Sequence, residues 1–300
     1  MTLHVAFHGR LGRDFRALRL LKSERGESTY VGEDCTSGAQ VVIKTTAAVR
    51  FTDAERLRCE HEIGALHGVD ATLLTAPSSV GINGDDAYCV RAYVEGITLQ
   101  ECISDGPMSP REVVDIGREI VAGLAQAHDR GVLHGDVKPA NVIIDAAMSP
   151  GGVTLVDVGF AASVRLEADA NELPVTAAHY VSPEQAGLLH RDVGACSDLY
   201  STGVVLFECL AGRAPFLGDS VGEVLRGHAS SRPPRLRALG ARCPRRSRSS
   251  SSACCARTPT TATSPPRRCG PTCPRSATRW IAARRTRRSC SASTSAAGAA

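Results

Sequence analysis

The stretch VLHGDVKPANVII, residues 132–144, carries the strongest signal in the sequence. Apolar residues stand at both of its ends, and an acid, an amine and an amide lie between them: Asp136, Lys138 and Asn141. Each of the three has an ordinary explanation when taken alone, because a single Asn often forms a local hydrogen bond in a turn. Together, between two segments that are expected to be buried, they indicate a polar site with a chemical purpose.

The composition is that of an ordinary folded protein. A chain of 300 residues with 43% hydrophobic content can form one or two domains with a real core. No apolar run approaches the length of a transmembrane helix, and the N-terminal residues lack the apolar region of a secretory signal. We therefore expect a cytoplasmic chain, in which the 12 cysteines do not form a disulfide framework. No CxxC pair is present to indicate a zinc site.

The charge is divided unevenly along the chain. Residues 241–300, here called the C-terminal tail, contain 13 Arg and neither Lys, Asp nor Glu. This leaves 22 of the 35 basic residues and all 31 acidic residues in residues 1–240, a net charge of −9 there. An acidic body and a basic tail look like two different kinds of sequence.

Helix signals are clear at three places. Thr52 with Glu55, and Ser109 with Glu112, have the spacing of a capping box, which predicts that a helix starts after each. The segment 197–212 is apolar almost all round and predicts a buried helix. One more helix is expected in DSVGEVLRGH, where a serine stands at the capping position.

Strand signals occur mainly in the first third of the chain. QVVIKT at 40–45 and AYCVRAYVEG at 87–96 have strand character, and short apolar runs surround the opening motif. Strands with one helix therefore come first, and helices dominate afterwards. This order predicts two lobes: an N-lobe at 18–95 and a C-lobe at 96–240.

The sequence resembles a eukaryotic-type Ser/Thr protein kinase, of the kind that opens large multidomain bacterial signalling proteins. The resemblance covers about residues 18–238, and several motifs in the family's order carry it: VVIK at 41–44, HGDVKPAN at 134–141, DVG at 157–159, SPE at 182–184 and SDLYSTGVV at 197–205. It implies an α+β, bilobal protein-kinase-like fold, with a small β-rich N-lobe that has one helix and a larger, mostly α-helical C-lobe.

The resemblance also implies a reaction, the transfer of the ATP γ-phosphate to a hydroxyl of a protein substrate with Mg²⁺. Such transfer depends on positioning and on neutralising phosphate charge. The implied roles are a catalytic base at Asp136, a phosphate contact at Lys138, nucleotide contacts at Lys44 and Gly26, and magnesium ligands at Asn141 and Asp157. No specific nucleic-acid partner is expected.

The resemblance further implies a carboxylate partner for Lys44 on the helix that follows VVIK. Glu62 fits the family's spacing, because Leu66 and Val69 then fall on core positions. Glu60 is the alternative. Only one of the two can point at Lys44 from a single helix face.

The sequence departs from the family pattern near the active residues. Gly135 replaces an Arg that receives an activation-loop phosphate in the family, so we expect activation that does not need a phosphate on Ser163 or Thr176. Ala177 stands where a Thr contacts the catalytic Asp and Lys. Val158 replaces the Phe of the metal-binding motif.

Two further departures affect the nucleotide pocket. Arg91 stands at the back of the adenine pocket, where the family keeps an apolar or small residue and where a charge needs a partner. In KSERGESTYVGED at 22–34, only Gly26 is in register with the glycine-rich loop. We expect a working but slow kinase. The alternative is a pseudokinase or truncated kinase that acts as a nucleotide-binding or interaction module.

The C-terminal tail cannot supply the two amphipathic helices that should complete the C-lobe. It contains no Leu, Val, Phe, Met or Tyr, and only Trp280 and Ile281 are large and apolar. Three explanations remain: a basic tail for nucleic acid or acidic membrane, a solvated linker, and a slip of the reading frame near residue 241. The abrupt loss of every Leu and every acid favours the slip. We therefore expect a truncated C-lobe, with Glu184 left without its Arg partner.

Overall fold

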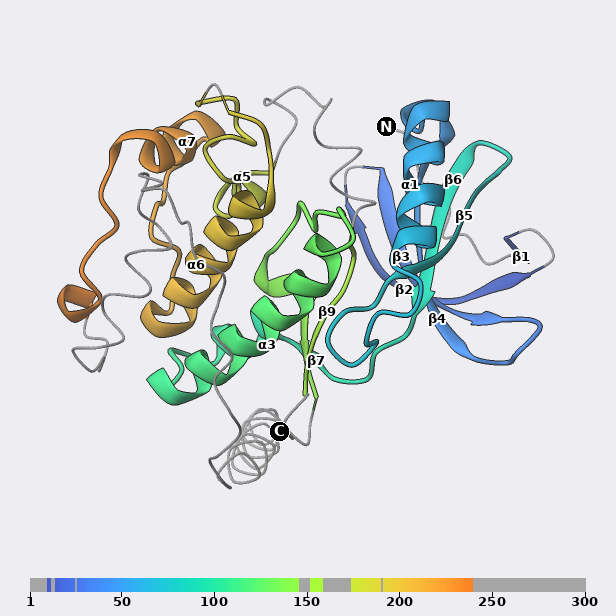
Figure 1. Ribbon diagram of the computed structural model, residues 1–300, viewed down its shortest axis with the longest axis horizontal. Coiled ribbons are helices and arrows are strands. Elements are labelled where there is room, and N and C mark those ends of the chain that lie inside the picture. Colours follow the sequence, from blue (N-terminus) through green and yellow to red (C-terminus); the bar gives the residue numbers. More distant parts are fainter. Residues whose placement is uncertain are drawn as a thin grey trace, which may run out of the picture.

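The computed structural model describes residues 10–11, 14–24, 26–145, 152–158, 174–189 and 191–239. Figure 1 shows a β-rich half in blue and a helical half in green to orange. The expected α+β, bilobal arrangement is thereby confirmed. The expectations for Ser163, for the Gly of the DVG motif and for the C-terminal tail lie outside the described residues.

The N-lobe is built on an antiparallel sheet. Within the described residues it has six strands in the order β1-β2-β3-β4-β6-β5. Ile43 and Val90, from neighbouring strands, are fully buried at its centre. The strand bounds are Arg10–Leu11 for β1, Phe15–Glu24 for β2, Glu27–Asp34 for β3, Gln40–Ala47 for β4, Pro77–Asn83 for β5 and Asp86–Ala92 for β6.

The pairing of β4 with β6 places the first site residues. Lys44 lies opposite Cys89, and Val42 lies opposite Arg91. Because side chains alternate across a strand, residues two apart share a face. Lys44 and Arg91 therefore project from the same face of the sheet, the face that borders the second lobe.

Helix α1, Asp53–Ala65, follows β4 after a 3₁₀ turn at Ala48–Arg50. The predicted capping box is present: the Thr52 side chain accepts from the backbone of Glu55, and the Glu55 carboxylate accepts from the backbone of Thr52. Figure 1 shows α1 standing against the sheet. The second predicted box, Ser109 with Glu112, is likewise present at the start of α3, Pro110–His128.

The C-lobe has α3 and α6 at its centre. They pack so closely that a Cβ on Gly117 would meet the side chain of Leu206 at 3.0 Å. Predicted helix 197–212 corresponds to α6, and a small sheet β7-β8-β9 lies beside α3. The bounds are α2 Leu99–Ser104, α3 Pro110–His128, α5 Val175–Ala178, α6 Ala195–Ala211 and α7 Val221–Ser230, with β7 Ile97–Thr98, β8 Val142–Ile144 and β9 Val153–Leu155, and 3₁₀ turns at Pro139–Asn141 and Leu236–Leu239.

The chain crosses between the lobes after β6. The predicted strand 87–96 ends at Ala92, earlier than expected. Gly96 then takes φ 151°, and a Cβ there would lie 2.5 Å from the backbone oxygen of Ile144. Only a residue without a side chain permits this approach, which explains why the strand pattern is interrupted by glycine at this point.

Candidate active site

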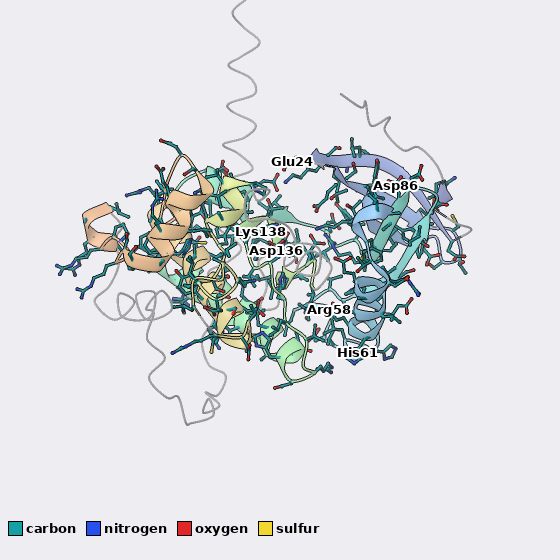
Figure 2. All side chains as sticks on the ribbon, turned by 90° about the horizontal axis from the view of Figure 1, so that it is seen from above. Glu24, Arg58, His61, Asp86, Asp136 and Lys138 are labelled. Carbon is teal, nitrogen blue, oxygen red and sulfur yellow. The ribbon has the colours of Figure 1, made fainter. Side chains whose placement is uncertain are left out.

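The polar residues of the opening motif lie in contact with one another. The carboxylate of Asp136 accepts a hydrogen bond from Lys138 Nζ at 2.5 Å and from Asn141 Nδ2 at 2.9 Å. Asn141 Nδ2 also donates to the backbone oxygen of Asp136 at 2.8 Å. Figure 2 shows Asp136 and Lys138 in the middle of the molecule, between the β-rich and the helical halves. One carboxylate is thus fixed beside one amine and one amide.

A buried carboxylate on α6 anchors this loop through hydrogen bonds to its backbone. Asp198 accepts backbone hydrogen bonds from His134 at 2.9 Å and Gly135 at 2.8 Å, and its Oδ2 lies 2.7 Å from His128 Nε2. Burial raises the pKa of Asp198, but the hydrogen bonds outweigh it and leave the pKa below its ordinary value. The carboxylate therefore stays ionised, as an acceptor for backbone donors.

His134 is the buried, hydrogen-bonded core histidine that the sequence suggested. It is fully buried. Its Nδ1 accepts from the backbone N–H of Asp136 at 3.3 Å, so Nε2 carries the proton that is donated to the oxygen of Val156 at 3.1 Å. The ring therefore links the loop to the segment that leads into Asp157 and has no free nitrogen for catalysis.

The second cluster gathers on Asp157. Lys44 Nζ lies 2.7 Å from Asp157 Oδ2, and Arg91 Nε lies 2.7 Å from Asp157 Oδ1. Burial acts to raise the pKa of Asp157, but the Lys44 ammonium and the Arg91 guanidinium hold it well below its usual range. A pocket lies here, and its lining includes all three of these residues together with Val42 and Cys89.

Asp157 also has an uncommon backbone conformation. Its φ is 66°, the only positive φ of a non-glycine residue among those the structure describes. Such a conformation costs free energy for an L-residue and persists only where the surroundings hold it. The carboxylate of this residue is held on both oxygens, by Lys44 and by Arg91.

The expected Lys44–Glu62 pair is not formed in the described structure, where each residue has another partner. Glu62 accepts instead from Arg58 Nε at 3.0 Å, one helical turn earlier on α1. Glu60, the alternative, is bound to Arg56 at 2.7 Å. The reason is competition: Arg58 reaches Glu62 along its own helix, and Lys44 reaches Asp157 within the pocket.

Glu62 is nevertheless the buried one of the two candidates. Its side chain is 8% exposed, compared with 46% for Glu60. Burial raises the pKa of Glu62, against the effect of Arg58, and its Oε2 atom is buried without a hydrogen-bond partner. A buried carboxylate oxygen without a partner is costly, which makes Glu62 the member of α1 with most to gain from a second cation.

Gly26 occupies the turn between β2 and β3, where Glu24 and Glu27 pair. Its φ of 81° favours glycine, and an added Cβ would have no neighbour within 4 Å. The conformation thus explains why glycine stands here. Its expected contact with nucleotide stays a prediction.

The departures from the family pattern are accommodated without disruption. Val158 is buried in the C-lobe core, and Ala177 lies in α5, where its N–H donates to Pro174. Gln185 was not singled out from the sequence. Its Nε2 donates to the backbone oxygen of Gly135 at 2.8 Å and so ties the segment after SPE to the catalytic loop. A lone Gln after a motif gave no signal of this contact.

Comparison with known proteins agrees with this geometry. The protein kinase domain family matches residues 25–254. Serine/threonine-protein kinase PrkC of Bacillus subtilis is 32% identical over 230 residues, which are 75% of this chain and 34% of PrkC. Serine/threonine-protein kinase pkn2 of Myxococcus xanthus is 34% identical over 224 residues, which are 73% of this chain and 27% of pkn2. The chain thus spans about a third or less of the length of these relatives.

Solved structures show the same fold at lower identity. The PknI kinase domain of Mycobacterium tuberculosis gives a TM-score of 0.59 at 22% identity, covering 78% of this chain and 84% of that chain. Rad53 1–466 in complex with AMP-PNP gives 0.63 at 18% identity, covering 81% and 60%.

The fold and the site together define a protein kinase domain. The chain belongs to the protein kinase family. Within that family it is a eukaryotic-type serine/threonine kinase domain of the bacterial kind, as the resemblance in its motifs predicted.

Proposed function

We propose that this domain transfers the γ-phosphate of ATP to a serine or threonine hydroxyl of a protein substrate, with Mg²⁺. The observation that carries the proposal is the fixed contact of Asp136 with Lys138 and Asn141, on a loop anchored to Asp198. A carboxylate beside an amine can accept the proton of an incoming hydroxyl while the amine neutralises phosphate charge.

Within this proposal Asp136 orients the hydroxyl and takes its proton. Its carboxylate is constrained from several sides, so its position does not depend on substrate. Lys138 stands within contact distance of that carboxylate, which supports a role for its amine in holding the transferred phosphoryl group. Lys44 supplies a second cation from the N-lobe side, 2.7 Å from Asp157.

The donor set suits magnesium. Asn141 and Asp157 offer an amide and a carboxylate, and Mg²⁺ prefers oxygen ligands of which phosphates and waters supply the rest. Among the described residues no group of three or more His, Cys, Asp or Glu could hold a metal by itself. A site in which Asn141 and Asp157 each supply one oxygen and the nucleotide supplies others is consistent with the ligand preference of Mg²⁺ and with the lack of a larger cluster among the described residues. When bound, the metal supplies charge neutralisation at the phosphates.

We also propose that Glu62 becomes the partner of Lys44 in the working enzyme. Its Oε2 is buried without a hydrogen-bond partner, while Lys44 is engaged by Asp157. If Asp157 turns to a metal, the Lys44 ammonium is released, and Glu62 offers a buried carboxylate on α1 with an unpartnered oxygen. The described arrangement would then be a resting one.

Two further features bear on the cellular location of the domain. Within the described residues, no helix combines the length and apolar character that crossing a bilayer requires. Six cysteines of the described part are free thiols, two of them exposed, which suits a reducing compartment. We propose the cytoplasm as its location and a protein as its partner, with no role for nucleic acid.

The decisive experiment is Asp136→Asn. We expect this variant to lose phosphate transfer from ATP to a serine-containing test peptide by at least about a hundredfold, the scale of a lost general base. Transfer is followed by mass spectrometry of the peptide. Asp115→Asn, on the exposed face of α3, is the matched control and should transfer at the wild-type rate.

Two outcomes would contradict the proposal. If Asp136→Asn transfers phosphate as fast as the wild type, Asp136 is not the base. If the wild type binds ATP with Mg²⁺ but transfers nothing to any serine or threonine peptide or to itself, the pseudokinase alternative replaces the kinase.

A further inference from the structure

Arg91 brings a third charge into the pocket where a small or apolar residue was expected. It comes from β6, and its guanidinium Nε donates to Asp157 Oδ1 at 2.7 Å. Its Nη1 donates to the backbone oxygen of Ala92 at 3.0 Å. The Arg91 side chain is only 12% exposed. The guanidinium is therefore anchored at two points and is not a surface group that happens to lie near an acid.

Both oxygens of Asp157 carry a cation in this arrangement. Lys44 is on Oδ2 and Arg91 is on Oδ1, each at 2.7 Å. Lys44 alone balances the charge of the carboxylate. With Arg91 added, the cluster of Lys44, Arg91 and Asp157 has a net charge of +1.

A metal ion and Arg91 require the same oxygen lone pairs. The guanidinium is a fixed, always charged group, and hydrogen bonds to charged partners are the stronger kind. A divalent cation that approaches Asp157 must therefore displace Arg91 from Oδ1 or accept a poorer position next to a positive charge.

We propose that Arg91 is a built-in competitor of the metal at Asp157, which keeps the site closed until metal and nucleotide arrive together. The inference rests on the proposed function, since it takes Asp157 as a magnesium ligand. The triphosphate supplies negative charge that receives the displaced guanidinium. Arg91 therefore sets the Mg²⁺ concentration at which nucleotide binds, and low Mg²⁺ leaves the site shut.

The test is the Mg²⁺ dependence of nucleotide binding, measured by calorimetry with ATP at a series of Mg²⁺ concentrations. Arg91→Met keeps the apolar stem and removes the charge. We expect its half-saturating Mg²⁺ concentration to fall by about tenfold or more, the change that follows from about 1.4 kcal/mol. Arg91→Lys keeps a cation and should stay close to the wild type. Arg118→Met, on the exposed face of α3, is the control for loss of an Arg as such.

A second variant pair separates competition from general loosening of the pocket. In an Asp157→Asn background the shared carboxylate is gone, so adding Arg91→Met should leave the Mg²⁺ dependence unchanged. Thermal unfolding without nucleotide checks that each variant is folded. Should Arg91→Met fail to fold, Arg91→Gln replaces it, with the same expected fall.

The outcomes divide cleanly. An unchanged or increased Mg²⁺ requirement in the uncharged variants overturns the competition, and leaves the proposed function standing if the wild type binds ATP in a Mg²⁺-dependent way. If neither the wild type nor any Arg91 variant binds ATP at any Mg²⁺ concentration, the proposed function and the inference fail together.

Discussion

The backbone N–H of Gly135 donates to Oδ1 of Asp198 at 2.8 Å, so a carboxylate buried in α6 holds the residue that stands where the family has an Arg. Gly135 takes φ 73°, which glycine adopts without steric cost. Its backbone oxygen is held at the same time by Gln185. Gly135 therefore makes two backbone hydrogen bonds, one to the buried Asp198 carboxylate and one from the Gln185 amide, and together they fix the catalytic loop at this residue.

Asp198→Asn should destabilise the domain strongly. The Asn amide brings N–H donors to a place where backbone N–H groups of the loop already point, so two hydrogen bonds cannot both be kept. We expect a loss of about 3 kcal/mol in the free energy of unfolding, typical of a broken buried ionic network. Urea unfolding measures it, with Asp115→Asn as the exposed control. A loss equal to that of the control would contradict the assigned role.

Activation should not require a phosphate on the segment before SPE. Gly135 has no side chain to receive one, and the loop is already held by Asp198 and Gln185. We expect Thr176→Ala, and Ser163→Ala in the part of the chain outside the described residues, to transfer phosphate at rates within about threefold of the wild type, well short of a lost catalytic group. Loss of transfer that Thr176→Glu restores would count against this expectation.

Arg58→Ala should raise the affinity for nucleotide with Mg²⁺. It removes the partner that holds Glu62 away from Lys44, and where Lys44 does not replace it the loss costs about 1 to 3 kcal/mol, because the Glu62 carboxylate is buried. Figure 2 shows Arg58 on α1, on the β-rich side of the molecule. Calorimetry with ATP and Mg²⁺ measures the affinity.

Arg56→Ala is the matched control for this change, because it removes the equivalent pair with Glu60 on the exposed side of the same helix. If both variants behave alike, Glu62 has no special relation to Lys44. The assignment of Glu62 as its partner would then have to be given up.

The domain should lose stability as the pH falls from about 6.5 to about 4. Burial lowers the pKa of His228 from 6.5 to about 4, and Tyr200 O–H lies 2.7 Å from its Nδ1. Between these values the unfolded chain binds a proton that the folded protein refuses, so unfolding is favoured by up to about 3 kcal/mol at the acid end.

His228→Gln should flatten this pH profile, because Gln does not titrate and can still accept from Tyr200. Burial also lowers the pKa of His179, which leaves a smaller slope in the variant. Urea unfolding at a series of pH values between 4 and 7 makes the comparison. An equal slope in variant and wild type would show that the acid sensitivity lies elsewhere.

The sequence predicted the helix starts well and singled out the polar residues that lie together in the catalytic loop. The capping boxes at Thr52 and Ser109 lie within four consecutive residues each, and the contacts of Asp136 with Lys138 and Asn141 span only five positions. Short-range spacing encodes such contacts directly, because the backbone leaves few ways to arrange them.

The sequence could not predict which long side chains meet across the pocket. Lys44 had two candidate carboxylate partners, and its pairing with Asp157 instead of Glu62 follows from tertiary contacts in which Arg58 engages Glu62. Arg91 was recognised as a charge in need of a partner, but the partner, Asp157, lies 66 positions away. Arg58 stands one helical turn before Glu62 in the sequence, and this spacing could have indicated the pair that the two residues form.

Glu184 accepts a hydrogen bond from within the C-lobe. Within the described residues its carboxylate accepts from Ser197 Oγ at 2.7 Å, and no Arg of the described part pairs with it. Sequencing the coding DNA across codons 235–300 should reveal a Leu-rich alternative frame with an Arg for Glu184. If no frame supplies one, the basic tail is genuine.

The three capping boxes have a consequence for how the chain is made. Thr52 with Glu55, Thr98 with Glu101, and the box that opens α3 each satisfy their own backbone donors from neighbouring residues. Chains emerge from the ribosome N-terminal end first, and domains begin to fold as they emerge. The groups that cap these helix starts are therefore all present in the chain before the C-terminal tail is synthesised.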